Sequence, residues 1–219
     1  MSKFFEELSR CLREGGIESS NIEDKRLEVF LHGQPVLFVS PGHDVFLLPA
    51  GSRNEEASDL YHRVAGMADE VYEYVEAVQN APLLRASSLK DEFHLLADFG
   101  GAVLAGIELP KEWGYQFNTW IWNYDRTALL YGHNYMGDFQ SAKQDFAVRS
   151  GLISKAQLFS PEELTELYRG TDYLLDEGPE LEDVQLKALQ TARTKIEYTV
   201  PDLTDRLEQG QEQEPQMDM

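Results

Sequence analysis

One stretch of the sequence, residues 114–153, combines the pattern of an aromatic β-hairpin with that of an amphipathic helix. It reads GYQFNTWIWNYDRTALLYGHNYMGDFQSAKQDFAVRSGLI. Successive side chains of a strand point to opposite faces of its sheet, so the hairpin has two rows. One row contains Tyr115, Phe117, Thr119, Ile121 and Asn123, and the other contains Gln116, Asn118, Trp120, Trp122 and Tyr124. Rings in both rows favour a central strand covered on both faces, and the alternative is that one row is a contact surface.

The rest of the sequence predicts an α+β fold of antiparallel hairpins and segregated helices. Three strands separated by turn residues are expected over residues 26–49, and two further hairpins over 92–136. Apolar residues at helical spacing predict helices over residues 2–14, 54–80 and 139–149. We therefore expect one α+β module over residues 1–82 and, after a connector at 82–90, a second over 90–203.

A helical pair is expected to complete the second module. Ser160 is a favourable N-cap, Pro161 suits the first helical position and Glu163 completes a capping box. The apolar stripe expected for this helix is formed by Leu164, Leu167, Tyr168, Leu174 and Leu175. A last helix is predicted over residues 181–198. Residues 205–219 are acidic, rich in glutamine and almost without apolar anchors, so a disordered tail is expected.

The charge of the chain restricts its partners. The 219 residues include 39 acidic and 19 basic side chains, which gives a formal net charge of -20. Residues 54–80 contain seven acidic side chains and one arginine, and residues 160–183 contain nine acidic side chains and one arginine. Such surfaces repel phosphate backbones, so direct nucleic-acid binding is not expected. The candidate interaction residues in these two regions are Glu70, Glu73, Glu76, Glu162, Glu163 and Glu166.

No motif for a cofactor, a metal ion or a covalent catalyst stands out, and none of the three is expected. The five histidines lie in different predicted elements or turns, without the spacing that places two imidazoles on one metal ion. Cys11 lies on the apolar face of the first predicted helix, where a thiol is usually a small core residue. Neither a membrane span nor a secretory signal is expected, and a cytoplasmic protein is the favoured interpretation.

A weaker candidate site lies in the hairpin of residues 115–136. Tyr124, Asp125 and Arg126 at its predicted tip, together with His133 on the return strand, could form a small polar pocket. Hairpin turns use such residues for their own hydrogen bonds, so the turn interpretation is favoured. The pocket stays open as an alternative.

Several segments resemble an uncharacterised family of accessory proteins. They are YQFNTW at residues 115–120, YDRT at 124–127, GH at 132–133, Tyr135 and AKQDFAVRSGLI at 142–153, with looser similarity at 80–84, 93–107 and 159–203. Members of this family occur on integrative and conjugative elements of gut Firmicutes, alone or in large proteins beside antirestriction-type modules. The resemblance covers about half to two-thirds of the chain. It implies a mobile-element context, and the family has no established site residues to carry over.

These observations favour binding over catalysis. The leading hypothesis is a non-enzymatic interaction protein of a mobile element, with DNA mimicry by rows of carboxylates as one specific form. Its partner would be a protein, for example a DNA-binding protein. The alternative is an enzyme or small-ligand binder that uses a cleft near the hairpin of residues 115–136. A third hypothesis is a structural domain detached from a larger polyvalent protein.

Overall fold

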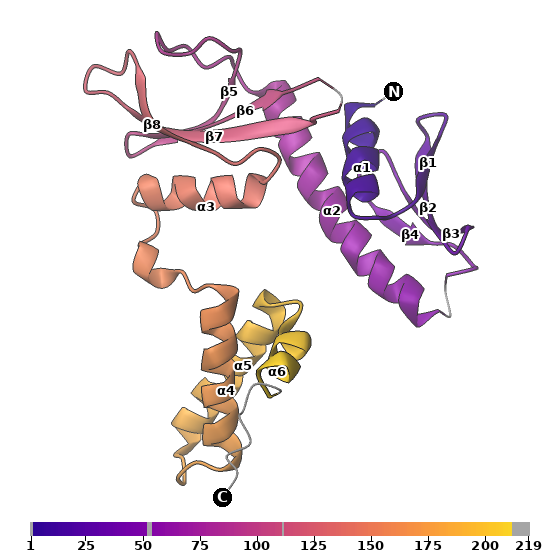
Figure 1. Ribbon diagram of the computed structural model, residues 1–219, viewed down its shortest axis with the longest axis vertical. Coiled ribbons are helices and arrows are strands. Elements are labelled where there is room, and N and C mark those ends of the chain that lie inside the picture. The colour runs from indigo at the N-terminus through magenta and orange to yellow at the C-terminus, as the bar shows by residue number, and fades with distance from the viewer. Residues whose placement is uncertain (1, 52–53, 111, 212–219) are drawn as a thin grey trace, which may run out of the picture. The chain divides into compact units, whose positions relative to one another are not determined.

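The chain folds into two compact units, Met1–Ile153 and Ser154–Met219. A computed structural model describes residues 2–51, 54–110 and 112–211. The first unit contains two four-stranded antiparallel sheets and three helices, and the second is helical (Figure 1). The expected α+β class is confirmed.

The N-terminal sheet has the strand order β1-β2-β3-β4, with β1 at Ser19–Ile22, β2 at Arg26–Leu31, β3 at Gln34–Val39 and β4 at Val45–Leu47. Helix α1, Lys3–Glu14, begins at the N-cap Ser2, whose side chain accepts a hydrogen bond from the backbone N–H of Phe5 at 3.4 Å. Strand β1 lies outside the three strands expected over residues 26–49. It is short and polar at an edge of the sheet, so it carries no run of alternating apolar residues for a sequence pattern to detect.

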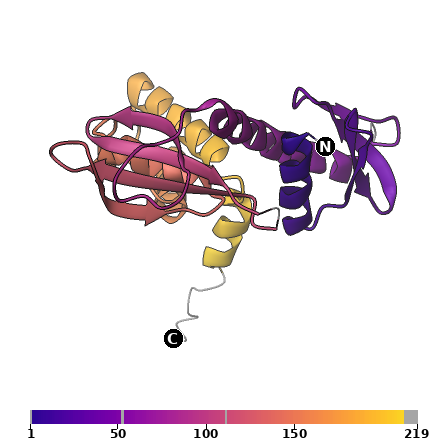
Figure 2. The ribbon, with the colours of Figure 1, turned by 90° about the horizontal axis from the view of Figure 1, so that it is seen from above.

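Helix α2, Glu55–Asn80, packs against both sheets of the first unit (Figures 1 and 2). Its buried residues share one apolar core with Leu27 and Leu37 of the N-terminal sheet and with Leu104 and Phe117 of the second sheet. The boundary between the compact units therefore falls after Ile153 rather than in residues 82–90, where the sequence analysis placed the junction between modules 1–82 and 90–203.

The second sheet has the order β5-β6-β7-β8, with β5 at His94–Phe99, β6 at Ala102–Glu108, β7 at Tyr115–Trp122 and β8 at Leu129–Asn134. The aromatic strand β7 is central, as its two rows of rings predict. Phe117 and its row face α2 and α3, Phe139–Arg149, whereas Trp120 and Trp122 pack in a smaller cluster on the opposite face. The apolar side chains that α3 buries are Phe139, Ala142 and Phe146.

The connector expected at residues 82–90 lies largely within a loop over residues 83–93, which closes on itself and crosses the second sheet. Its ends are joined by the hydrogen bond from Leu84 N–H to the Phe93 carbonyl, at 2.7 Å. Its middle is fixed to the far edge of the sheet, where the Ser87 N–H donates to the Thr127 carbonyl at 2.9 Å and the Leu129 N–H donates to Ser88 Oγ at 2.9 Å. This loop covers the outer cluster that contains Leu84, Phe93, Val103, Ala105 and Leu129.

The second unit contains a short 3-10 turn, Lys155–Gln157, and helices α4, Pro161–Asp176, α5, Asp183–Thr199, and α6, Leu203–Gln211. The predicted capping box between Ser160 and Glu163 is confirmed. The prediction of disorder from residue 205 is wrong for residues 205–211, which are helical. Leu203 and Leu207 anchor them against α4 and α5, and two apolar side chains suffice for so short a helix. Residues 212–219 lie outside the described part of the chain.

Candidate functional site

Two of the three glutamates proposed on α2, Glu73 and Glu76, form hydrogen bonds with neighbouring side chains. Both carboxylate oxygens of Glu73 accept hydrogen bonds from Lys143 Nζ of α3, at 2.8 and 2.9 Å. Burial raises the pKa of Glu70, and the nearby Asp138 raises it further, against the opposing effect of Lys143. Glu76 accepts a hydrogen bond from Asn80 Nδ2 at 3.1 Å. Glu73 therefore fastens α2 to α3 and Glu70 is half-buried, so these glutamates do not form an unoccupied row of charges.

The glutamates proposed on α4 border a shallow apolar cavity. Glu162, Glu163 and Glu166 line a cavity of ≈ 520 Å³, and the exposed side chains of Phe159 and Leu167 complete its walls. Glu162 pairs with Arg206 of α6 at 2.9 Å, and its pKa is lowered by a hydrogen bond from its own backbone N–H, with Ser160 and Arg206 adding to the effect.

The hairpin residues do not converge on one pocket. Tyr124 is fully exposed, and Asp125 accepts a hydrogen bond from Thr127 Oγ1 at 2.7 Å, which lowers its pKa. Arg126 donates to Asp98 of β5 and lies 5.3 Å from the centre of the Trp122 ring. His133 instead contacts a carboxylate on α3. Asp125 thus stabilises the turn, whereas Arg126 and His133 form separate contacts with Asp98 and Asp145.

That carboxylate, Asp145, is the centre of a polar cluster that the sequence analysis missed. It accepts a hydrogen bond from Thr119 Oγ1, lies 3.2 Å from His133 Nδ1 and 3.6 Å from Arg149 Nη1, and interacts with Tyr135. Burial acts to raise the pKa of Asp145, but the hydrogen bonds from Thr119, Tyr135 and His133 outweigh it, so the pKa is lowered. The spacing of Asp145 and Arg149 by one helical turn was the available signal, because it places both on one face of α3.

Arg149 completes this cluster from the end of α3. It donates to the Thr119 Oγ1 at 2.8 Å and to the Tyr131 carbonyl in β8. Tyr131 has a φ of 52° where the pairing of β7 with β8 shifts register. The cluster therefore joins α3 to two strands and supports an irregular edge strand, which is a structural task.

A second polar cluster is buried between α1 and α2. Arg10 donates to both carboxylate oxygens of Glu7, at 2.6 and 2.9 Å, and Tyr74 donates to the same carboxylate at 2.8 Å. Cys11 lies beside them, partly buried, with its Sγ 3.6 Å from the Tyr74 hydroxyl. Burial raises the pKa of the Cys11 thiol to about 11, so its reactive thiolate is scarce at neutral pH.

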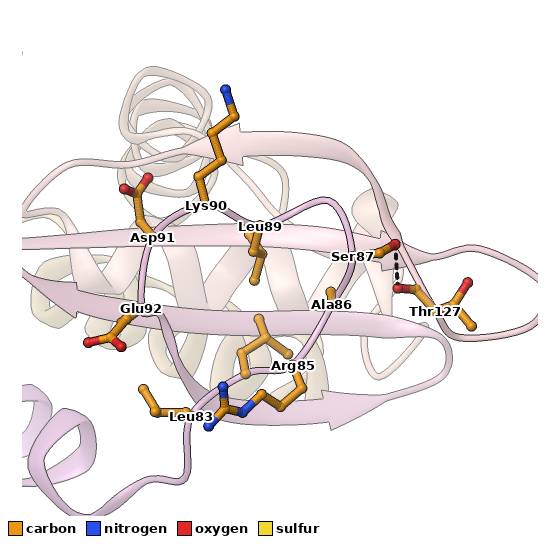
Figure 3. A pocket seen from close by; sticks show the side chains of 10 residues that line it. Leu83, Arg85, Ala86, Ser87, Leu89, Lys90, Asp91, Glu92 and Thr127 are labelled. Atoms are coloured by element: carbon orange, nitrogen blue, oxygen red, sulfur yellow. Dashed lines mark hydrogen bonds between the residues drawn. The ribbon is translucent and has the colours of Figure 1, made fainter.

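A cavity of ≈ 610 Å³ lies within the loop of residues 83–93 (Figure 3). Leu89 points into the loop, whereas Lys90, Asp91 and Glu92 point away from its centre. Small-molecule sites combine an apolar wall with a few polar groups that point at the ligand. The charged side chains of this cavity diverge, so its walls do not have that arrangement.

In the described residues, no group of three or more His, Cys, Asp and Glu side chains could hold a metal ion. No helix among them has the length and apolar character needed to cross a membrane. No protein-family model, curated protein or solved structure matches the chain. The resemblance to accessory proteins of conjugative elements therefore stays a prediction.

Proposed function

We propose that this chain is a non-enzymatic interaction protein that binds a basic protein partner through its C-terminal helical unit. The observation that supports this proposal is a run of uncompensated negative charge between α4 and α5. This run contains five carboxylates, those of Asp176, Glu177, Glu180, Glu182 and Asp183. None of them forms an ion pair with a described residue. Uncompensated carboxylates of one sign attract cationic surfaces and speed their association.

A DNA-binding protein is the partner class that this charge fits best. Proteins that hold duplex DNA present lysine and arginine to its phosphates, and an array of carboxylates competes for the same cations. The mobile-element context implied by the sequence resemblance points to a host restriction enzyme, in an antirestriction role. In this proposal Glu70 and Glu73 belong to the scaffold, since burial and Lys143 already engage them.

The proposal is tested by competition between the protein and labelled duplex DNA for a purified restriction enzyme. We expect release of DNA that weakens steeply as salt rises. The variant Asp176→Asn, Glu177→Gln, Glu180→Gln should require about tenfold more protein for the same release, because each lost charge weakens attraction to the cationic partner.

A matched control removes the same number of charges from α2, through Glu55→Gln, Asp59→Asn and Glu76→Gln. This control should compete like the unmodified protein. Equal losses in the two variants would show that net charge alone acts, and the proposed surface would be rejected. Unchanged competition by the first variant would also reject it.

The alternative functions receive less support. A ligand binder or enzyme needs polar groups that converge, whereas the charged groups around the 83–93 loop diverge and the hairpin residues are engaged separately. A structural domain detached from a larger protein would not compete with DNA for any enzyme in this assay. If the unmodified protein released DNA from none of a panel of DNA-binding proteins, the third hypothesis would be favoured.

A further inference from the structure

Helix α4 has apolar side chains on two faces. Leu164 and Tyr168 point inward and pack against Ile196, Val200 and Leu203. Leu167 and Leu174, assigned to the same stripe by sequence, are 47% and 36% exposed. The helix therefore has an outer apolar face that the core of its own unit does not use.

The outer face is organised for contact with another helix. Leu167, Gly170 and Leu174 are spaced by three and four residues, which places them in one row along the helix. Apart from its chain neighbours and the nearby backbone of its own helix, no atom of the described residues lies within 4 Å of the position that a Cβ on Gly170 would occupy. Glycine inside a helix costs about 1 kcal/mol relative to alanine, so Gly170 does not serve helix stability. Its missing side chain leaves a gap in the row through which a second backbone can approach closely.

Negative charge borders this row at the N-terminal end of the helix. Leu167 shares the ≈ 520 Å³ cavity with Phe159, which is 54% exposed, and with Glu162, Glu163 and Glu166. Glu163 is occupied by the capping box. Glu162 pairs with Arg206 and Glu166 lies 3.7 Å from Arg169, but their side chains are 70% and 73% exposed, so both carboxylates stay accessible to a further cation. A complementary surface would thus carry apolar side chains in the middle and cations along one flank.

We propose that the row formed by Leu167, Gly170 and Leu174 docks an amphipathic, basic α-helix of a partner protein. The apolar face of that helix would cross α4 at Gly170, and its lysine or arginine side chains would lie beside Glu162 and Glu166. Recognition of a helix through apolar anchors at helical spacing is a common mode of peptide binding. This inference rests on the proposed function and adds the docking surface and the kind of element that it receives.

The test measures binding of a fluorescein-labelled synthetic helical peptide to the full chain by anisotropy. The peptide carries leucine at helical spacing and lysine along one flank, and a second peptide carries glutamate at the lysine positions. The variant Gly170→Trp fills the row with a large ring, from a position where an added Cβ meets open space. The control Thr194→Trp adds the same ring to an exposed position of α5.

We expect Gly170→Trp to weaken binding of the basic peptide at least about tenfold and Thr194→Trp to leave it within about twofold. The acidic peptide should bind at least about tenfold more weakly than the basic one. Circular dichroism of both variants checks that helicity is retained. Binding of the basic peptide that survives Gly170→Trp, or no binding to the unmodified protein, would overturn the inference.

Two further outcomes would also overturn it. Equal affinity for both peptides would remove the argument from charge, and self-association that Gly170→Trp abolishes would make a second copy of this chain the occupant. The proposed function is judged separately, by the variant that neutralises Asp176, Glu177 and Glu180. If that variant fails in DNA competition while Gly170→Trp competes normally, the function stands and the docking surface falls.

Discussion

At the scale of single residues, the buried pair of Glu7 and Arg10 explains why position 114, far along the chain, is a glycine. Gly114 has a φ of 66°, and a Cβ on it would lie 2.4 Å from Arg10 Nε. A side chain at this position would therefore strain the backbone and displace the guanidinium from Glu7. The turn before β7 and the helix α1 are matched to each other through this single contact.

Removal of Arg10 should be costly because it leaves Glu7 charged and buried. We expect Arg10→Met to lower the free energy of unfolding by about 3–5 kcal/mol, as for other broken buried ion pairs. The double variant Glu7→Gln, Arg10→Met should recover much of this loss, since glutamine is neutral and still accepts the hydrogen bond from Tyr74. Urea unfolding measures both. Equal losses in the single and double variants would show that packing, not charge, sets the cost.

At the scale of secondary-structure elements, α3 is held on the second sheet by apolar packing and by Asp145. Because the folded-state pKa of Asp145 is lowered, its carboxylate stabilises the fold at pH values above its unfolded pKa of about 4. This contribution is lost as the pH falls through the lower, folded-state value. Thr119, Tyr135 and His133 all form hydrogen bonds with this carboxylate and together lower its pKa.

The variant Asp145→Asn should therefore cost about 1–3 kcal/mol of unfolding free energy at pH 7, since it leaves donors of the cluster poorly matched. The difference from the unmodified protein should shrink as the pH falls below about 4. Urea titrations between pH 3 and pH 7 measure this. A difference that is constant over the whole range would mean that the charge of Asp145 contributes nothing.

The elements that sequence predicts best are those defined by local signals. The capping box at Ser160 and the apolar face of α3 are specified within a few residues, and both are present. Strand β1 was missed because it is short and polar, although its partner β2 follows it directly in the chain. Helix α6 was missed because Leu203 and Leu207 are held by packing against α4 and α5. The helical spacings of Asp145 with Arg149 and of Glu7 with Arg10 show only part of the two polar clusters. Their other members, such as Thr119 beside Asp145 and Tyr74 beside Glu7, are remote in sequence, so local spacing could not reveal them.

At the scale of the whole molecule, the two compact units differ in the size of their cores. In the described part of the second unit, the core is formed by four buried apolar side chains, Tyr168, Ile196, Val200 and Leu203. The main core of the first unit extends through α1, α2, α3 and both sheets. Stability against local opening depends on buried apolar contacts, so the second unit should be the less protected.

We expect backbone amides of α4, α5 and α6 to exchange with deuterium faster than those of α2, β6 and β7, by factors of about a hundred or more. Thermal unfolding should accordingly have two steps, with loss of helical signal from the second unit first. Hydrogen exchange read by mass spectrometry resolves the two units. Equal protection in both would show that they unfold as one cooperative body.

The shared core of α2 also sets an order of events during synthesis of the chain. Leaving the ribosome from its N-terminus, the chain has α1 and the N-terminal sheet ready before α2 appears, so the first half of α2 meets its partners at once. Val75 and Val78 in the second half must wait until Leu104, Phe117 and α3 have been made. For that interval the nascent chain exposes an apolar helix end, the kind of surface that chaperones bind.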